Sequence, residues 1–214
     1  MFTGIVQSVG RIEQVLAGAG AVKLLVDPGS MTLDDVAIGD SIAVSGCCLT
    51  VVALEPAARA PRLAFDVSHA TLACTTGLDR RGPVNLEKAM RLSDRLGGHL
   101  VSGHVDGVGV VVANEPVARD GASDRRFVID APADVARFVA AKGSIAVAGV
   151  SLTVNAVAGT RFEVNLIPHT LDATTLGALR AGDRVNLEID LIARYVARLT
   201  GFADSIAASA ARKE

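Results

Sequence analysis

Short runs that alternate hydrophobic and polar residues dominate the chain, and Gly, Pro or Asp interrupt them. Such runs, rich in Val, Ile and Thr, are typical of β-strands joined by turns. No long helical run separates them, so each half should close its strands into a small antiparallel barrel, which leaves no unpaired sheet edge. The predicted strands are 3–9, 21–26, 41–44, 49–54 and 63–67 in the first half, and 105–113, 126–130, 144–147, 152–157, 162–166 and 185–189 in the second.

Other segments have helical patterns. Short helices are predicted at 31–36, 70–76, 93–96, 132–139 and 171–176. The last segment, 191–213, is rich in alanine, lacks proline and repeats apolar residues at helical spacing. A helix beyond both barrels has no core of its own to cover, so we expect an oligomer contact; packing back on its own barrel is the alternative. Its apolar face comprises Ile192, Val196, Leu199, Phe202 and Ile206.

The chain repeats itself. The sequence SIAVSGCCLTV at 41–51 returns at 144–154 as SIAVAGVSLTV, with eight of eleven positions identical. Both copies continue with Phe-Asp/Glu-Val, then Thr-Leu, then Val-Asn-Leu-Glu. We therefore expect an all-β fold of two tandem, similar six-stranded antiparallel Greek-key barrels plus a C-terminal α-helix. The expected bounds are 1–90, 91–189 and, for an oligomerisation helix, 190–214.

The two copies differ at positions that can carry chemistry. Cys48 of the first copy corresponds to Ser151 of the second, and His104 and Asp190 stand where the first copy has aliphatic residues. A purely structural repeat would exchange one core aliphatic residue for another. The differences therefore predict two half-sites with different tasks.

Composition narrows the possible functions. Half of the residues are hydrophobic and the net charge is −2, as in a globular protein with a substantial core. Basic residues are scattered and aromatic residues make up 3%, so no nucleic-acid surface is expected. The first residues form neither a signal peptide nor a membrane anchor, so the cytoplasm is the expected location and no membrane contact is expected.

The cysteines predict neither a disulfide framework nor a zinc site. Cys47, Cys48 and Cys74 form an odd set without C-x-x-C spacing, and the four histidines lie outside metal-ligand spacing with them. Alternation along a strand sends neighbouring side chains to opposite faces. We therefore expect Cys47 in the core and Cys48 at the functional face.

Five motifs, in order along a duplicated chain, resemble those of the riboflavin synthase family. They are MFTGIV at 1–6, GCCLTV at 46–51, GGHLVSGH at 97–104, GVSLTV at 149–154 and IPHTL at 167–171. The resemblance implies dismutation of two 6,7-dimethyl-8-ribityllumazine molecules to riboflavin and 5-amino-6-(D-ribitylamino)uracil, the final step of riboflavin biosynthesis. It further implies a homotrimer with active sites between subunits, and it allows an association with lumazine synthase. No cofactor or metal is expected, because electrons pass only between the two substrates.

The same resemblance assigns site residues. The implied catalytic residues are Cys48, His104, Ser151 and Asp190. Cys48 would add to a lumazine ring or hydrogen-bond it, and His104 would move protons, since an imidazole titrates near neutrality. Residues of the N-terminal barrel, including Cys48 and His99, would form one side of the active site. Ser151 of a neighbouring subunit would lie on the other side. The implied substrate-binding residues are Phe2, Thr3, Gly4, Ser41, Thr50, Thr71, His99, Gly103, Thr153, Ile167, His169 and Thr170.

Simpler roles remain open for several of these residues. Cys48 could be a small buried hydrophobe, His104 could anchor a glycine-flanked turn, and Thr153 could be an ordinary strand residue. Two features also depart from the family. Ala70 stands where the first repeat commonly has Glu, and the segment 76–83 is shorter than its counterpart 175–184. Both departures bear on substrate affinity more than on fold.

Two other functions fit parts of the sequence. A lumazine- or flavin-binding protein of the same fold would hold a chromophore without turning it over, which Ala70 favours and the four catalytic candidates disfavour. A flavin-dependent oxidoreductase domain would need a G-x-G-x-x-G turn, and Gly107-Val-Gly109 lacks the third glycine and a following helix.

Overall fold

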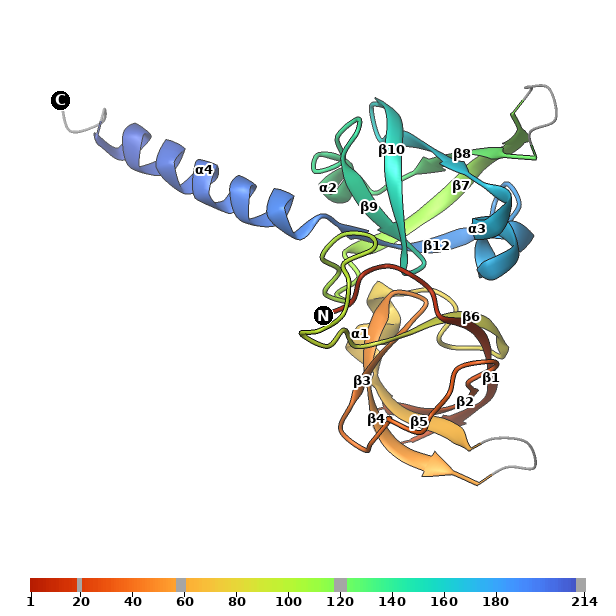
Figure 1. Ribbon diagram of the computed structural model, residues 1–214. Coiled ribbons are helices and arrows are strands. Elements are labelled where there is room, and N and C mark those ends of the chain that lie inside the picture. The colour runs from red at the N-terminus through yellow and green to blue at the C-terminus, as the bar shows by residue number, and fades with distance from the viewer. Residues whose placement is uncertain (19–20, 57–60, 118–122, 211–214) are drawn as a thin grey trace.

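The computed structural model describes residues 1–18, 21–56, 61–117 and 123–210, with side chains as far as residue 200. It consists of two closed six-stranded antiparallel barrels and a C-terminal helix, α4 (Leu191–Ala210), that projects away from both barrels (Figure 1). The expected fold of two similar barrels plus a terminal helix is therefore confirmed. None of the helices in these ranges is long and apolar enough to span a bilayer.

The first barrel has the strand order β1-β2-β5-β4-β3-β6, closed by pairing of β1 with β6. The pairing of β2 with β5 and of β3 with β6 gives the Greek-key connections. Large apolar side chains from alternate strand positions, such as Phe65 and Ile42, fill the barrel interior. The elements are β1 (Ser8–Ala17), β2 (Ala21–Asp27), β3 (Ser41–Val44), β4 (Cys47–Glu55), β5 (Arg62–Ser68), α1 (His69–Cys74) and β6 (Gly82–Lys88).

The second barrel repeats this order as β7-β8-β11-β10-β9-β12. Phe127 and Phe162 are fully buried in its interior, as Phe65 is in the first barrel. The sequence repeat is therefore also a structural repeat. The elements are β7 (Gly107–Pro116), β8 (Arg125–Asp130), α2 (Ala133–Ala136), β9 (Ser144–Val147), β10 (Val150–Ala158), β11 (Arg161–Leu166), α3 (Pro168–Ala173), the 3-10 helix η1 (Thr175–Ala178) and β12 (Arg184–Ile189).

Three local predictions are wrong. Strand β1 begins at Ser8 rather than at residue 3, because the preceding residues form a loop that reaches the second barrel. The segments 31–36 and 93–96 form turns instead of helices. In each segment a hydrogen bond between residues three apart closes a single turn, and no helix follows it. Asp94 Oδ2 accepts from Arg91 N at 2.7 Å, and Val36 N donates to Leu33 O at 3.0 Å. The end of the predicted terminal helix, 211–213, lies outside the described residues.

Asparagine side chains join the two barrels. Asn85 on β6 donates from Nδ2 to Ala148 O at 2.9 Å, and its Oδ1 accepts from Thr175 N at 2.8 Å. Asn186 on β12 makes the equivalent bonds to the first barrel. Both asparagines are buried, and a buried amide that lost its bonds would carry a free-energy cost. The reciprocal pair therefore fixes how the barrels sit relative to each other.

Candidate functional site

Cys48 lies on β4 under a loop of the second barrel. Its backbone N donates to Gly103 O at 2.8 Å. Gly103 has φ +80°, and an added Cβ would lie 2.6 Å from Cys48 Cβ, so only glycine fits this approach. Glu188 holds the loop, because its carboxylate accepts from Ser102 N and Oγ, both at 2.7 Å, and from Gly103 N at 2.9 Å. His104, the next residue, is exposed beside the loop that covers Cys48.

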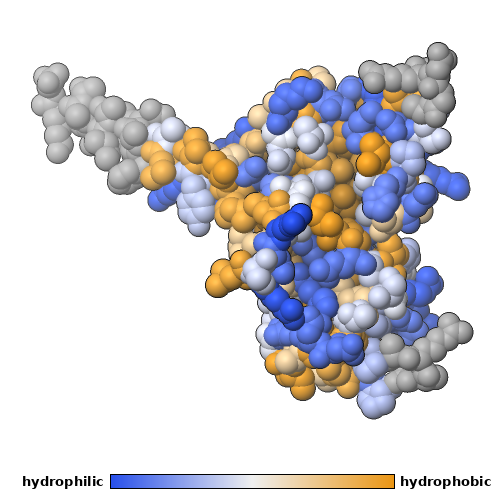
Figure 2. Space-filling view, viewed as in Figure 1, coloured by the Kyte–Doolittle hydropathy of each residue, from blue (hydrophilic) through white to orange (hydrophobic). Residues whose placement is uncertain are grey.

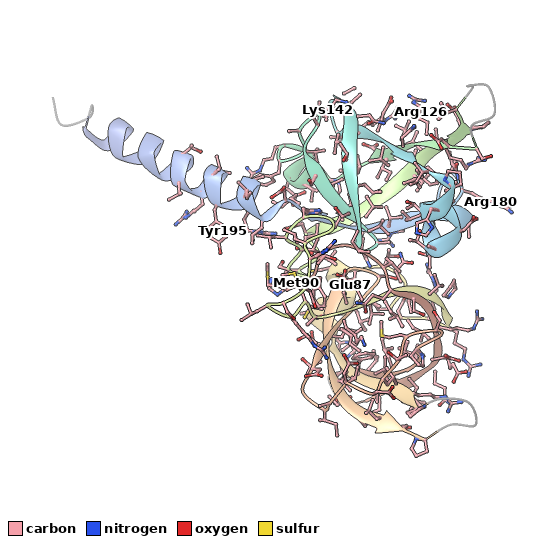
Figure 3. All side chains as sticks on the ribbon, in the orientation of Figure 1. Glu87, Met90, Arg126, Lys142, Arg180 and Tyr195 are labelled. Atoms are coloured by element: carbon pink, nitrogen blue, oxygen red, sulfur yellow. The ribbon has the colours of Figure 1, made fainter. Side chains whose placement is uncertain are left out.

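Ser151 occupies the equivalent place on β10, under the N-terminal loop. Its N donates to Gly4 O at 2.8 Å, and a Cβ at Gly4, which has φ +76°, would lie 2.6 Å from Ser151 Cβ. Glu87 holds this loop by accepting from Thr3 N and Oγ1, both at 2.7 Å, and from Gly4 N at 3.0 Å. Figure 3 labels Glu87, which lies where the two barrels meet. Each half-site thus combines a strand of one barrel with a loop of the other.

The two glutamates are buried carboxylates. Burial raises the pKa of Glu87 and of Glu188, and the hydrogen bonds from the loops oppose this shift only in part, so both pKa values stay above the ordinary value. These residues were not predicted from the sequence. The signal was present, because the motif Asn-Leu-Glu lies near the end of the last strand of both copies and places an acid in an otherwise buried strand.

Ser151 has a histidine neighbour, and Cys48 has none at hydrogen-bond distance in the described residues. His99 Nδ1 lies 2.7 Å from Ser151 Oγ, and His99 N donates to Thr3 O at 3.1 Å. Burial lowers the pKa of His99, and the nearby charge of Asp190 opposes this only in part. The ring is therefore neutral at pH 7, and it can exchange a proton with the serine hydroxyl or with a bound molecule.

The structure corrects the grouping of the site residues. His99 was expected on the Cys48 side, facing Ser151 of another subunit, but it is bonded to Ser151 of its own chain. The backbone before His99 runs directly over Ser151, because His99 N is bonded to Thr3 O. It passes so close that a Cβ on Gly98 would lie 2.8 Å from Ser151 Cβ. The half-site of the second barrel therefore contains Ser151, His99 and, nearby, Asp190, whose Oδ1 also accepts from Ile192 N at the start of α4.

The two adjacent cysteines separate as expected. Cys47 points into the first barrel and is 5% exposed, and its burial raises the pKa of the thiol to about 12, which keeps it protonated. Cys48 is half-buried on the outer face. Thr50 shares this face and pairs across the ladder with Ser41, as Thr153 pairs with Ser144 in the second barrel. The alternation prediction is confirmed.

Phe2 is a packing residue in this structure. It is 0% exposed and lies between the barrels with Ala43, Val101 and Ala146, where its backbone pairs with Val101. Its ring also lies against Gly103. Phe2 therefore supports the loops by packing, and its expected contact with substrate stays a prediction. Thr3 and Gly4 are buried too, and they shape the Ser151 half-site through the bonds to Glu87.

Four expected substrate-binding residues lie at the first turns of α1 and α3. Thr71 Oγ1 lies 3.0 Å from Ser68 Oγ at the start of α1. Ile167 is exposed before α3, and His169 and Thr170 form its first turn. Among the described residues, none of the four is hydrogen-bonded to Cys48 or Ser151. Their contact with substrate stays a prediction.

The described residues contain no group of three or more His, Cys, Asp and Glu side chains that could hold a metal ion. A cavity of about 270 Å³ borders the first half-site and is lined by Ser41, Ile42, Lys88 and Ala89, among others. Asp35 at its rim is bonded to Lys88 Nζ at 2.7 Å, and this cation lowers the pKa of the Asp35 carboxyl. This cavity is therefore polar and charged.

Comparisons with known proteins agree with this arrangement. The model of the lumazine binding domain family matches the chain twice, at residues 3–89 and 102–190. A riboflavin synthase of Mycobacterium bovis is 46% identical over 206 residues, which cover 93% of this chain and 98% of that protein. A riboflavin synthase of Brucella abortus is 42% identical over 205 residues, 94% of this chain and 99% of that protein.

Solved structures give the same result. The crystal structure of LumP complexed with 6,7-dimethyl-8-(1'-D-ribityl) lumazine superposes with a TM-score of 0.75 at 26% identity, covering 88% of this chain and 99% of that one. LumP complexed with riboflavin also has a TM-score of 0.75. The doubled family match, the identity to whole relatives and the duplicated barrels lead to one conclusion: the chain belongs to the riboflavin synthase family, built from two lumazine binding domains.

Proposed function

We propose that this chain catalyses the riboflavin synthase reaction, in which one 6,7-dimethyl-8-ribityllumazine donates four carbons to a second. The observation that carries the proposal is the pair of unlike half-sites on like barrels. Cys48 lies with the His104 loop on one barrel, and Ser151 lies with His99 on the other. Two identical substrate molecules must play unlike roles, and the two half-sites suit this requirement.

The Ser151 half-site is assigned to the acceptor lumazine. A neutral His99, held against Ser151 Oγ, can take a proton from the hydroxyl or from a water molecule that adds to the ring. The Cys48 half-site is assigned to the donor, whose C7 methyl group must lose a proton. Cys48 is half-buried and His104 is exposed there, and both can exchange protons.

The two half-sites act together when subunits assemble. Helix α4 extends from the body of the protein (Figure 1). Apolar side chains are exposed on the part of the helix nearest the barrels (Figure 2). Ile192 is 66% exposed and Leu199 is 69% exposed, and Val196 lies between them on the same face. A stripe of this kind on an isolated helix favours association. We assign α4 to a homotrimer in which the Cys48 half-site of one subunit faces the Ser151 half-site of the next.

A cytoplasmic location is consistent with the absence of a spanning helix in the described residues. Lumazine synthase, which would supply the substrate, is the proposed macromolecular associate. Co-purification from a cell that expresses both proteins would test this association.

The deciding experiment is incubation of the purified chain with 6,7-dimethyl-8-ribityllumazine alone, without metal or nicotinamide. We expect one riboflavin for every two lumazines consumed, followed by absorbance and chromatography. The second candidate is a lumazine-binding protein without turnover, which the likeness to LumP complexes favours. Tight, stoichiometric binding without riboflavin formation would support that candidate and contradict the synthase proposal.

A further inference from the structure

A groove lies between the barrels, and neither Cys48 nor Ser151 lines it. Its volume is about 330 Å³. It is formed where the segment before β6 of the first barrel meets the segment between η1 and β12 of the second, close to α3 in Figure 1. The hairpin turns at Ser45 and Ala148 line it as well. None of its lining residues is among those expected to bind lumazine.

The groove is rich in positive charge. Arg80, Arg81 and Arg184 line it, and none of the three has an ion pair or a side-chain hydrogen bond to any described residue. Asp183 is the one carboxylate among its lining residues, and its Oδ2 is already engaged by Arg180 N at 2.7 Å. Three arginines and a single carboxylate that is already bonded therefore line the groove, and a bound anion would relieve the repulsion between the arginines.

Two hydroxyl groups in the groove are also available. Thr76 and Thr175, which correspond to each other in the two repeats, both line it. Their backbone N–H groups are fixed by Asn186 and Asn85, at 2.7 and 2.8 Å. Neither hydroxyl has a hydrogen-bond partner among the described residues. The groove therefore presents uncommitted donors from both barrels.

We propose that this groove binds the phosphate group of a small phosphorylated molecule. Guanidinium groups bind phosphate oxygens in pairs of strong, charge-assisted hydrogen bonds, and threonine hydroxyls add neutral donors. The volume is at the lower end of ligand pockets, which suits a compact phosphomonoester or free phosphate rather than a nucleic-acid strand. Two of the three arginines come from 76–83, the segment that is shorter than its counterpart in the second repeat.

The site bridges the barrels, so an occupant would contact both. Arg80 and Arg81 belong to the first barrel and Arg184 to the second. A phosphate bound by all three would hold the barrels together more tightly. The proposal does not depend on the synthase reaction, because none of these residues lies in the Cys48 or Ser151 half-site.

Titration calorimetry of the full chain tests the proposal, with inorganic phosphate and ribose 5-phosphate as probes at constant ionic strength in chloride. We expect saturable binding of one phosphate group per chain. Arg81→Gln and Arg184→Gln should each weaken binding about tenfold or more, since each removes a charged hydrogen bond. Arg180→Gln is the matched control, because Arg180 is exposed next to the groove but does not line it, and it should bind as the unmodified chain does.

The outcomes separate the sources of the phosphate. Tighter binding of ribose 5-phosphate than of inorganic phosphate would assign a phosphomonoester, and equal affinities would assign free phosphate; both support the site. Absence of saturable binding, or equal weakening by Arg180→Gln, would overturn it. Circular dichroism and lumazine binding serve as controls for folding. Because the changed side chains are exposed, both should be the same in all three variants as in the unmodified chain.

Discussion

Glu188 controls the loop that covers Cys48, and its removal gives the sharpest test of the half-site geometry. Glu188→Ala deletes three hydrogen bonds, from Ser102 N, Ser102 Oγ and Gly103 N. A buried donor left without an acceptor costs about 1–3 kcal/mol. Two effects reduce this loss. Ser102 is only partly buried, so its hydroxyl can hydrogen-bond to water instead. Removal of Glu188 also removes the cost of burying its carboxylate, the same burial that raises its pKa. We therefore expect the free energy of unfolding to fall by about 2–3 kcal/mol.

The functional effect should exceed what stability alone explains. Gly103 O accepts from Cys48 N, so a loosened loop exposes Cys48 and displaces His104. We expect Glu188→Gln, which keeps the shape but loses charge, to lower kcat about tenfold or more, because small displacements of reacting groups are costly. Iodoacetamide should alkylate Cys48 faster in Glu188→Gln than in the unmodified chain. Mass spectrometry distinguishes this product from alkylation of the exposed Cys74.

Glu87→Gln provides the matched control for this experiment. Its amide oxygen can still accept from Thr3, but its amide nitrogen cannot accept from Gly4 N, so it weakens the same set of bonds over Ser151 instead of over Cys48. A similar loss of stability is therefore expected, without faster alkylation of Cys48. If Glu188→Ala unfolded at the same denaturant concentration as the unmodified chain, or if both glutamine variants exposed Cys48 equally, the assigned role of Glu188 would be refuted.

The pKa of His99 in the folded chain lies below its ordinary value of 6.5. As the pH drops from about 7.5 to about 5.5, the unfolded chain therefore binds a proton that the folded chain does not, and the free energy of unfolding should fall. His99→Gln should make this free energy, measured in denaturation curves, depend less on pH. Gly103→Ala should abolish turnover and cost about 1–3 kcal/mol, because φ is positive and the new Cβ meets Cys48. Asn186→Ala should lower the free energy of unfolding by about 1–3 kcal/mol, since it removes bonds between the barrels.

Each of these predictions has a result that would contradict it. For His99, it is an unchanged pH dependence in the glutamine variant. For Gly103, the control is Gly77→Ala, which has a similar φ of +84° but open space around its Cβ; equal turnover in both alanine variants would show that the contact with Cys48 is unimportant. For Asn186, it is a denaturation midpoint equal to that of the unmodified chain.

Strand alternation and the repeat determined most of the fold. The side-chain period of a strand is a local property, so the sequence alone predicted the two barrels and the opposite orientations of Cys47 and Cys48. The unlike residues at equivalent positions, such as Cys48 and Ser151, are also visible when the two repeats are aligned. Two half-sites with different chemistry therefore follow from the amino-acid sequence by itself.

Only the tertiary structure decided how the half-sites are assembled. Glu87 and Thr3 are 84 residues apart, and Glu188 and Ser102 are 86 apart. His99 meets Ser151, rather than the Cys48 side, because the chain crosses from one barrel to the other at the Phe2–Val101 pairing. Bonds of this kind depend on how the two barrels are placed relative to each other, and no local pattern of hydrophobic and polar residues encodes that placement.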